Sequence, residues 1–288
     1  MDNPHGRYPL ANSLSPIDDF RSRYQTDGYC FPVDVLSSNE AIAYRHRLES
    51  IERRFQSSLP LDRFLKFDPH YLLPVVDELV RLPSLLDIVA ELLGPDLLVS
   101  NTNIFLKEAN SEHFVTWHQD LRYIGLDGDD FLTVWLALTP ANKENGCMQF
   151  LRGSHQERLE HVDTYAENNM LTRGQSIVNG IDPSRVVDVL LEPGQASIHH
   201  GWMAHASGAN RSEERRFGLV IRYMAPHLKQ TIAQQDYGML VRGEDRYQHF
   251  VSPPRPARNF EPLAIERYEK IRSERRGFLY SQAKTVRY

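Results

Sequence analysis

The chain has 288 residues, of which 41% are hydrophobic and 25% charged, and its formal net charge is −5. This composition is typical of a globular protein, and it lacks the basic field that nucleic-acid-binding proteins usually carry. Single all-β barrels of this length are ordinary. We therefore expect one domain over residues 1–288 that binds a small molecule and no nucleic acid.

The chain contains only two cysteines, Cys30 and Cys147, so no disulfide framework can hold the fold. Two buried thiols in a reducing compartment are the simpler interpretation. The first residues show no basic stretch followed by an apolar run, and no apolar run is long enough to span a bilayer. We therefore expect a cytoplasmic enzyme or binding protein without membrane association.

Helical patterns dominate residues 15–96, after a loosely held tail over residues 1–14. Helices are predicted over 16–27, with Ser15 as its N-cap, over 37–56, with Ile42, Leu48, Ile51 and Phe55 near one face, and over 74–93, interrupted near Pro83. A strand is predicted over 29–35 and an irregular segment over 59–73. We interpret this region as a buttress for the part that follows.

From Leu97 onward the sequence pattern changes to that of short strands separated by turn residues. Strands are predicted over 97–109 and 113–120, as neighbours, and within 131–140, 144–155, 184–200 and 215–226. Such a series indicates an antiparallel barrel or jelly roll over 97–226. Residues 156–184 form a long polar insertion of the kind that often covers a site.

The last part, residues 227–288, is expected to be a helical extension, with its best helix over 262–278. A charge run from Arg272 to Arg276 lies in this helix. Such a run, if accessible, is most simply explained as a solvated face, with a docking surface as the alternative.

His118 and Asp120 are separated by one residue, so on an extended strand both side chains point to the same face. His205 can supply a third ligand from far downstream. Two imidazoles and one carboxylate with open positions suit a non-haem Fe(II) site. The alternative is a simple salt-bridged pair of His118 and Asp120. Of the adjacent His199 and His200, which point to opposite faces, His200 is the better candidate for lining the pocket.

Arg216 begins an apolar strand and is a candidate for holding the remote carboxylate of an oxo-acid co-substrate, because a guanidinium binds a carboxylate through two parallel hydrogen bonds. Arg215 and Arg222 compete for this role, and Arg222 shares a strand face with Arg216 if no bulge intervenes. Lys107 is a second candidate cation, although a surface lysine is an equally good interpretation.

Several segments together resemble the phytanoyl-CoA dioxygenase family of Fe(II)- and 2-oxoglutarate-dependent oxygenases. These are HQD at 118–120, the following strand with its tryptophan, ENGCMQFLRGSH at 144–155, PGQASIHHGWMAHASGANRS at 193–212 and the arginine that trails them. The opening helix followed by DGY is also similar to the family's usual start. The resemblance covers roughly residues 15–226.

The resemblance implies a mainly β, cupin-like double-stranded β-helix with flanking helices. It implies that His118, Asp120 and His205 bind iron, that Arg216 binds the distal carboxylate of 2-oxoglutarate, and that Lys107, Gln119, Trp135 and Ser207 lie near this co-substrate. The reaction would consume O2 and release succinate and CO2. Because Asp120 is present, hydroxylation is favoured over halogenation.

The substrate is expected to be a small polar metabolite, held by groups near the metal ligands. The candidates are Asn101, Asn103, Arg122, Tyr123 and Trp202. One hypothesis is an aminophosphonate, and a quaternary ammonium group could be held by Tyr123 or Trp202. Hydroxylation or desaturation in secondary metabolism, or of an acyl-CoA, stays open, as does the oligomeric state. A non-catalytic metal-binding barrel and a zinc hydrolase are alternatives of another class, which the retained arginine disfavours.

Overall fold

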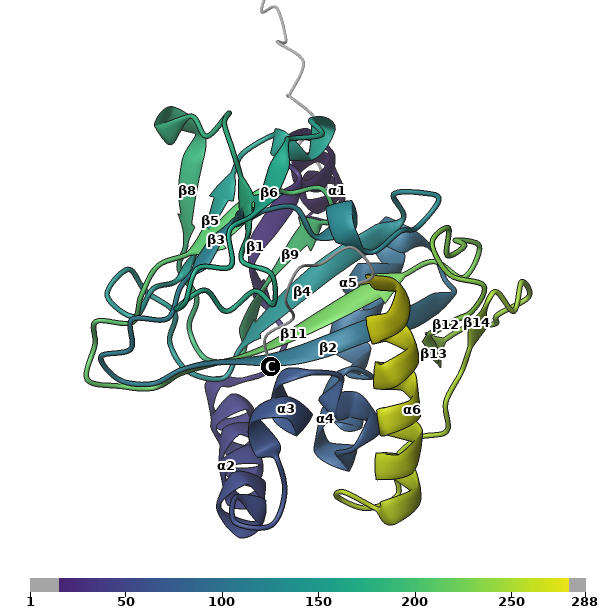
Figure 1. The fold of residues 1–288 in the computed structure, drawn as a ribbon. Coiled ribbons are helices and arrows are strands. Elements are labelled where there is room, and N and C mark those ends of the chain that lie inside the picture. Colours follow the sequence, from purple (N-terminus) through teal and green to yellow (C-terminus); the bar gives the residue numbers. More distant parts are fainter. Residues whose placement is uncertain (1–15, 280–288) are drawn as a thin grey trace, which may run out of the picture.

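The computed structural model describes residues 16–279, and two antiparallel β-sheets form its centre (Figure 1). The larger sheet has the order β1 (Tyr29–Asp34), β9 (Gln195–His200), β4 (Phe131–Ala137), β11 (Arg216–Met224), β2 (Leu97–Lys107) and β13 (Met239–Arg242). The smaller sheet has the order β3 (Val115–His118), β10 (His205–Ser207), β5 (Met148–Leu151) and β8 (Val186–Val189). Two further pairs of strands lie outside them, β6 (His161–Asp163) with β7 (Gln175–Ile177) and β12 (Asp236–Tyr237) with β14 (Phe250–Val251).

The two sheets face each other across a shared apolar layer. Trp135 and Val220 of the larger sheet lie in one buried cluster with Met148 and Phe150 of the smaller sheet. Two packed antiparallel sheets with helices on the outside are the jelly-roll arrangement. The predicted mainly β fold is therefore confirmed, and both cysteines are buried and form no disulfide.

Helices cover the outer face of the larger sheet, below it in Figure 1. The α-helices are α1 (Pro16–Asp27), α2 (Ser38–Phe55), α3 (Leu61–Lys66), α4 (Pro74–Leu79), α5 (Pro83–Leu93) and α6 (Pro262–Leu279), and the 3-10 helices are η1 (Pro69–Tyr71), η2 (Asp120–Tyr123), η3 (Ser154–Gln156) and η4 (Pro183–Arg185). A capping box starts α2, because Ser37 and Glu40 each accept a hydrogen bond from the other's backbone N–H. None of the described helices has both the length and the apolar composition that a membrane crossing requires.

Side chains of β11 alternate between the apolar core on one face of the sheet and the candidate site on the other. Its odd-numbered residues Phe217, Leu219, Ile221 and Tyr223 pack with the helices in the largest apolar cluster. Its even-numbered residues, which include Arg216 and Arg222, point between the sheets. Arg216 and Arg222 therefore share the inner face, as the sequence predicted.

Several details differ from the sequence-based expectations. Strands β2 and β3 belong to different sheets and are not neighbours. Helix α3 and η1 occupy the segment that was expected to be irregular. Ile42 is 40% exposed, because Ala41 takes the buried position of α2 in its place. The proposed N-cap Ser15 and the N-terminal tail lie outside the described residues.

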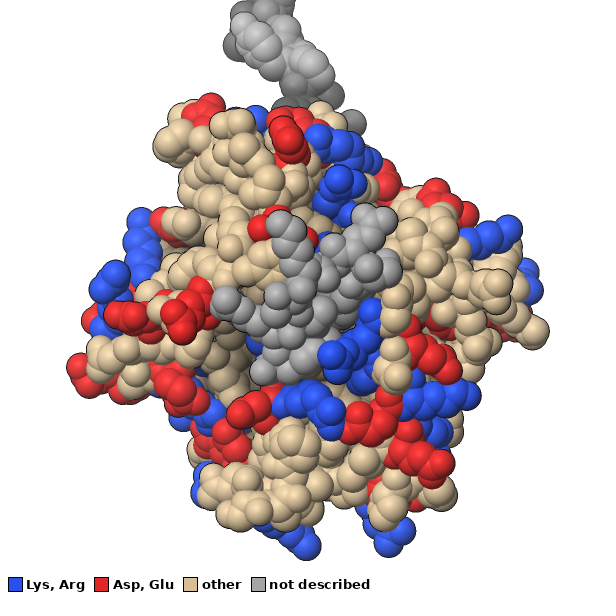
Figure 2. All heavy atoms as spheres, in the orientation of Figure 1, with Lys and Arg blue, Asp and Glu red and all other residues tan. Residues whose placement is uncertain are grey.

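Two arginines of the charge run in α6 do not belong to a solvated face, although Ser273, Glu274 and Arg276 of the same run are exposed. Arg272 and Arg275 are buried and point toward the carboxylates of Asp68 and Asp236. Elsewhere on the face drawn in Figure 2, acidic and basic side chains of the described residues are interspersed. The buried arginines therefore form an internal charge cluster, next to the cavity described below.

Candidate active site

Strand pairing brings the three predicted metal ligands together. His205 in β10 lies directly opposite His118 at the end of β3. Asp120 is the first residue of η2 and not part of a strand, yet its carboxylate reaches the same point. One nitrogen or oxygen of each of these three residues lies within 4.8 Å of the others, and all three residues are buried. The expectation that they converge is confirmed, while their role as ligands stays a prediction.

Both imidazoles have the tautomer that metal binding needs. His118 Nδ1 lies 2.9 Å from the carbonyl oxygen of Thr116, and His205 Nδ1 lies 3.0 Å from that of Met203. Because a carbonyl oxygen only accepts, each Nδ1 must carry the hydrogen, which leaves the Nε2 lone pairs free for an ion. Burial holds the pKa of His205 well below its usual range, so this ring is neutral.

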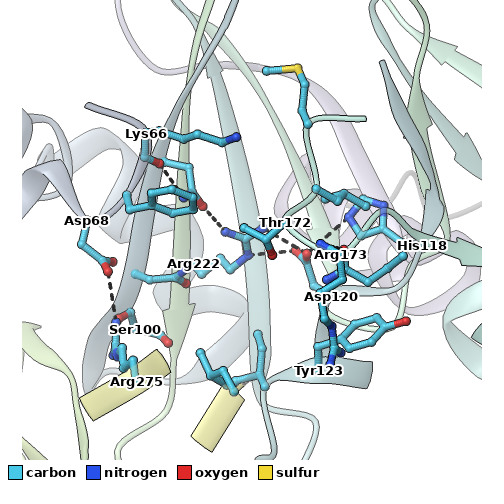
Figure 3. A pocket seen from close by; sticks show the side chains of 18 of the residues that line it. Lys66, Asp68, Ser100, His118, Asp120, Tyr123, Thr172, Arg173, Arg222 and Arg275 are labelled. Carbon is cyan, nitrogen blue, oxygen red and sulfur yellow. Dashed lines mark hydrogen bonds and ion pairs between the residues drawn. The ribbon is translucent and has the colours of Figure 1, made fainter. Parts of the chain in front are cut away.

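Arg222 binds Asp120 through two parallel hydrogen bonds. Its Nε lies 2.9 Å from Oδ2 and its Nη2 3.0 Å from Oδ1, and Thr133 donates a third hydrogen bond to Oδ2 (Figure 3). Burial alone would raise the pKa of Asp120, but Arg222 and His118 together hold it well below its usual range. The carboxylate is therefore ionised and fixed in direction before any metal binds.

Arg216 and Lys107 form the other charged part of the site. They lie directly opposite each other on β11 and β2, and both are almost completely buried. Arg216 Nη1 donates to the carbonyl oxygen of Gly146 and, at 3.2 Å, to Ser207 Oγ. Lys107 Nζ donates to Ser207 Oγ at 2.5 Å and to the carbonyl oxygen of Gly208. All of these acceptors are neutral.

No carboxylate among residues 16–279 forms an ion pair with either cation, and Arg216 Nε has no partner. Burial lowers the pKa of Arg216 to about 10, and burial with the charge of Arg216 lowers the pKa of Lys107 to about 6. A protonated Lys107 directly opposite Arg216 would be repelled by it, so Lys107 gains its charge readily only when a counter-charge is present. The pair therefore fits the distal carboxylate of a ligand. Arg215, in contrast, is held on the outer side by Glu52 and Glu108.

Because Gly218 has no side chain, the indole of Trp135 has room to pack beneath Arg216. Gly218 lies between Arg216 and Val220 on the inner face of β11. A Cβ atom at Gly218 would be 2.1 Å from the indole of Trp135. The guanidinium of Arg216 lies over that same indole, with its Cζ 5.1 Å from the ring centroid. Gly218 is therefore needed for Trp135 to support Arg216.

Two cavities meet at the three predicted ligands. The smaller one lies between the sheets, and its wall includes Arg216, Trp135, Ser207 and His205. The larger one, of about 160 Å³, extends from His118 and Asp120 toward the helices (Figure 3). His118 and Arg222 line both cavities. The arrangement suits one ligand on each side of a shared metal position.

The prediction that His200, and not His199, is the better candidate for lining the pocket was wrong. His199 lines the smaller cavity, with its ring centroid 4.6 Å from that of His205, and neither of its ring nitrogens has a partner among the described residues. His200 points to the opposite side, toward Tyr24 and His155. Which face of β9 looks inward depends on its pairing with β1 and β4, so spacing alone could not choose between the two histidines.

Three other expected residues are not brought to either cavity. The amide of Gln119 is used by the backbone of Ser154, Glu157, Leu159 and Trp202. Trp202 donates to Asp129 and has Arg158 over its ring at 4.1 Å. Arg122 is exposed. Gln119 therefore supports the loop after β5 and does not contact the co-substrate position.

The remaining substrate candidates do line the larger cavity, namely Asn101, Asn103 and Tyr123. The insertion contributes residues 170–173 and Gln175 to the same wall. Among these, Arg173 lies over the ring of Tyr123, with its Cζ 4.7 Å from the centroid. The sequence reasoning missed Arg173, as well as Lys66 and Arg272 on the opposite wall.

Comparison with known proteins agrees with this geometry. The solved apo structure of the non-haem monooxygenase ThoJ has a TM-score of 0.82 and 37% sequence identity, and the match covers 91% of this chain and 98% of ThoJ. A probable alpha-ketoglutarate-dependent hypophosphite dioxygenase of Stutzerimonas stutzeri is 30% identical over 59% of this chain, and the match spans 60% of that relative's length. The L-proline trans-4-hydroxylase of Streptomyces griseoviridis is 25% identical over 73% of this chain and 87% of the relative.

The protein is thus a non-haem iron oxygenase of the class that uses 2-oxoglutarate and O2. The family model described as phytanoyl-CoA dioxygenase (PhyH) matches residues 24–218, and the chain belongs to this family. The resemblance seen in the sequence motifs is confirmed.

Proposed function

We propose that the protein hydroxylates an unactivated C–H bond of a small polar metabolite, with conversion of 2-oxoglutarate and O2 to succinate and CO2. His118, Asp120 and His205 are the iron ligands, and Arg216 with Lys107 holds the distal carboxylate of 2-oxoglutarate. One observation carries the proposal: two buried basic side chains that have no carboxylate partner among residues 16–279 lie beside three converging metal-ligand side chains. Neither a zinc hydrolase nor a metal-storage barrel needs such a carboxylate site.

Each group of side chains around the site has a separate role in the proposed reaction. When bound, iron(II) with 2-oxoglutarate and O2 supplies the oxidant that replaces hydrogen by hydroxyl. Arg222 keeps Asp120 ionised, and Arg222 with Thr133 fixes the direction of its carboxylate. The backbone carbonyls of Thr116 and Met203 orient the two imidazoles. His199, whose ring nitrogens are free, offers a hydrogen bond to the ligand in the smaller cavity.

The larger cavity is the proposed substrate site, because it reaches the metal ligands from the side opposite to Arg216. A quaternary ammonium substrate is disfavoured, because the two aromatic rings proposed to bind it already have arginines over them. Arg173 lies over the ring of Tyr123, and Arg158 lies over that of Trp202. An anionic substrate, such as the aminophosphonate considered above, is the better proposal. The hypophosphite dioxygenase, a relative named for a phosphorus oxyanion, supports it.

The test is an anaerobic titration of the purified protein with Fe(II) and then 2-oxoglutarate, followed by visible spectroscopy. Wild-type protein should develop the metal-to-ligand charge-transfer band of a chelated 2-oxo acid. Arg216→Met should require far more 2-oxoglutarate for the same band, while Arg215→Met, a neighbouring change on the outer face, should behave as wild type. Iron binding without any band in the wild type would reject the proposal.

A further inference from the structure

Two cations from different helices lie against one aromatic ring in the larger cavity. Arg272 of α6 has its Cζ 4.3 Å from the centroid of Phe67, and Lys66 of α3 has its Nζ 5.4 Å from the same centroid. All three residues line the cavity. Both positive groups therefore lie beside the same ring on the wall of the cavity.

Neither cation is fully matched by the chain itself. Within residues 16–279, Lys66 Nζ forms no hydrogen bond or ion pair, and Asp62 is the only carboxylate that favours its charged form. Burial lowers the pKa of Lys66 in consequence. Arg272 Nη1 lies 3.5 Å from Asp68 Oδ2, and among residues 16–279 the buried Nη2 of Arg272 has no hydrogen-bond partner.

The neighbouring Arg275 shows what a fully matched arginine looks like in the same cavity. Its Nε donates to Asp236 at 2.7 Å, and its Nη2 donates to the carbonyl oxygens of Tyr237 and Ser100 at 2.6 and 3.0 Å. Every nitrogen of its guanidinium has an acceptor, because Nη1 also faces Asp68 at 3.5 Å. Arg275 therefore holds the fold together and leaves nothing for a ligand.

The charges of the cavity wall do not balance. Its cationic residues are Lys66, Arg173, Arg222, Arg272 and Arg275, and its carboxylates are Asp68, Asp120 and Asp236. Arg222 pairs with Asp120, Arg275 with Asp236, and Arg173 with Asp163 outside the wall, while Arg272 and Arg275 share Asp68. Among residues 16–279, Lys66 forms no such ion pair. An excess of buried positive charge is costly unless an anion compensates it.

We infer that Lys66 and Arg272 form a subsite for an oxyanion of the substrate, a carboxylate, phosphonate or phosphate group. This inference rests on the proposed function, which places the substrate in the larger cavity. Figure 3 shows Lys66 on one side of that cavity and His118 with Asp120 on the other, with Arg222 between them. A molecule anchored at the subsite extends toward the metal ligands, so the subsite selects which carbon is presented.

The test uses the Fe(II) and 2-oxoglutarate complex under nitrogen, titrated in a calorimeter with methylphosphonate and, separately, with acetate. The two probes distinguish a phosphonate site from a carboxylate site. Wild-type protein should bind at least one of them. Arg272→Gln and Lys66→Gln should each weaken that binding by about tenfold or more, since each removes a charge-assisted hydrogen bond. Arg272→Lys, which keeps the charge, should retain more of the binding than Arg272→Gln.

Lys270→Gln is the matched control, because Lys270 is on the same helix but 71% of its side chain is exposed. It removes the same charge and should leave binding unchanged. Equal affinity in wild type and both glutamine variants, or no binding of either anion, would overturn the inference. A preference for tetramethylammonium over both anions would also overturn it. Loss of the charge-transfer band in the wild type would instead indicate failure of the proposed function.

Discussion

Arg216 and Arg222 lie six residues apart on the same face of β11, yet their surroundings are opposite. Arg222 has a carboxylate of the chain, Asp120, bound through two hydrogen bonds. Arg216 has only neutral oxygens as acceptors, and a second basic side chain, Lys107, lies across from it. The difference teaches how to recognise a binding residue. A buried arginine that already binds a carboxylate of the chain positions that carboxylate. A buried arginine without a counter-charge is a candidate for binding an anionic ligand.

The largest effect is expected from Asp120→Ala, which should abolish 2-oxoglutarate turnover. The same change leaves Arg222 buried without its partner, so the free energy of unfolding should fall by about 3–5 kcal/mol. Adding Arg222→Met should recover much of that stability but no turnover. Succinate release and urea unfolding measure both results. Turnover that survives Asp120→Ala would remove Asp120 from the metal site.

The second prediction compares the stabilities of the two arginine variants. Arg222→Met leaves Asp120 unpaired and should cost about 3–5 kcal/mol of unfolding free energy, together with a clear loss of Fe(II) affinity. Arg216→Met removes a buried charge that has no counter-charge among residues 16–279, so the unfolding free energy of the apoprotein should stay the same or rise. Similar losses in both variants would contradict the distinction between the two arginines.

The third prediction concerns co-substrate binding. Arg216→Met should raise the 2-oxoglutarate concentration for half-maximal charge-transfer absorbance by about 100-fold, the effect of losing a charged pair in a buried site. Arg222→Met should change this concentration much less once iron is saturating. An unchanged requirement in Arg216→Met would shift the role to Lys107.

The smallest effect is a dependence on pH. The pKa of Lys107 is lowered to about 6 from its ordinary 10.5, so Lys107 of the apoprotein is mostly neutral at pH 8. A bound carboxylate raises this pKa, and binding of 2-oxoglutarate should therefore take up a proton. Affinity should weaken with rising pH above about 6, by at most about tenfold per unit. The apoprotein should become more stable over the same range, because its unfolded chain binds more protons there.

Calorimetry at pH 8 in two buffers of different ionisation enthalpy measures the proton taken up. The uptake should disappear in Lys107→Met. A binding enthalpy independent of the buffer in wild type would contradict the low pKa of Lys107.

The candidate site was accessible from the sequence because its signals are local. The spacing of His118 and Asp120, and the position of Arg216 at the start of an apolar strand, do not depend on distant contacts. His118 and Asp120 converge even though Asp120 begins η2. Their roles stay predictions until the variants are measured.

Long-range contacts explain what the sequence could not show. Strand β2 pairs with β11, more than 100 residues away, and nothing in residues 97–120 indicates that β3 belongs to the other sheet. One missed signal was readable: Ala264, Tyr268, Ile271 and Arg275 recur at helical spacing on the buried side of α6. That stripe places arginine in the core, but its partner Asp68 lies 207 residues away.

The contact between Gly218 and Trp135 has a consequence for how this enzyme can change. The depth of the smaller cavity depends on an absent methyl group, since any side chain at Gly218 would push the indole out of place and Arg216 with it. A replacement of this one residue would thus displace Arg216, the group proposed to hold the distal carboxylate of 2-oxoglutarate. Under the proposed function, a substitution at Gly218 would therefore change the affinity for 2-oxoglutarate, although every charged group of the site stays the same.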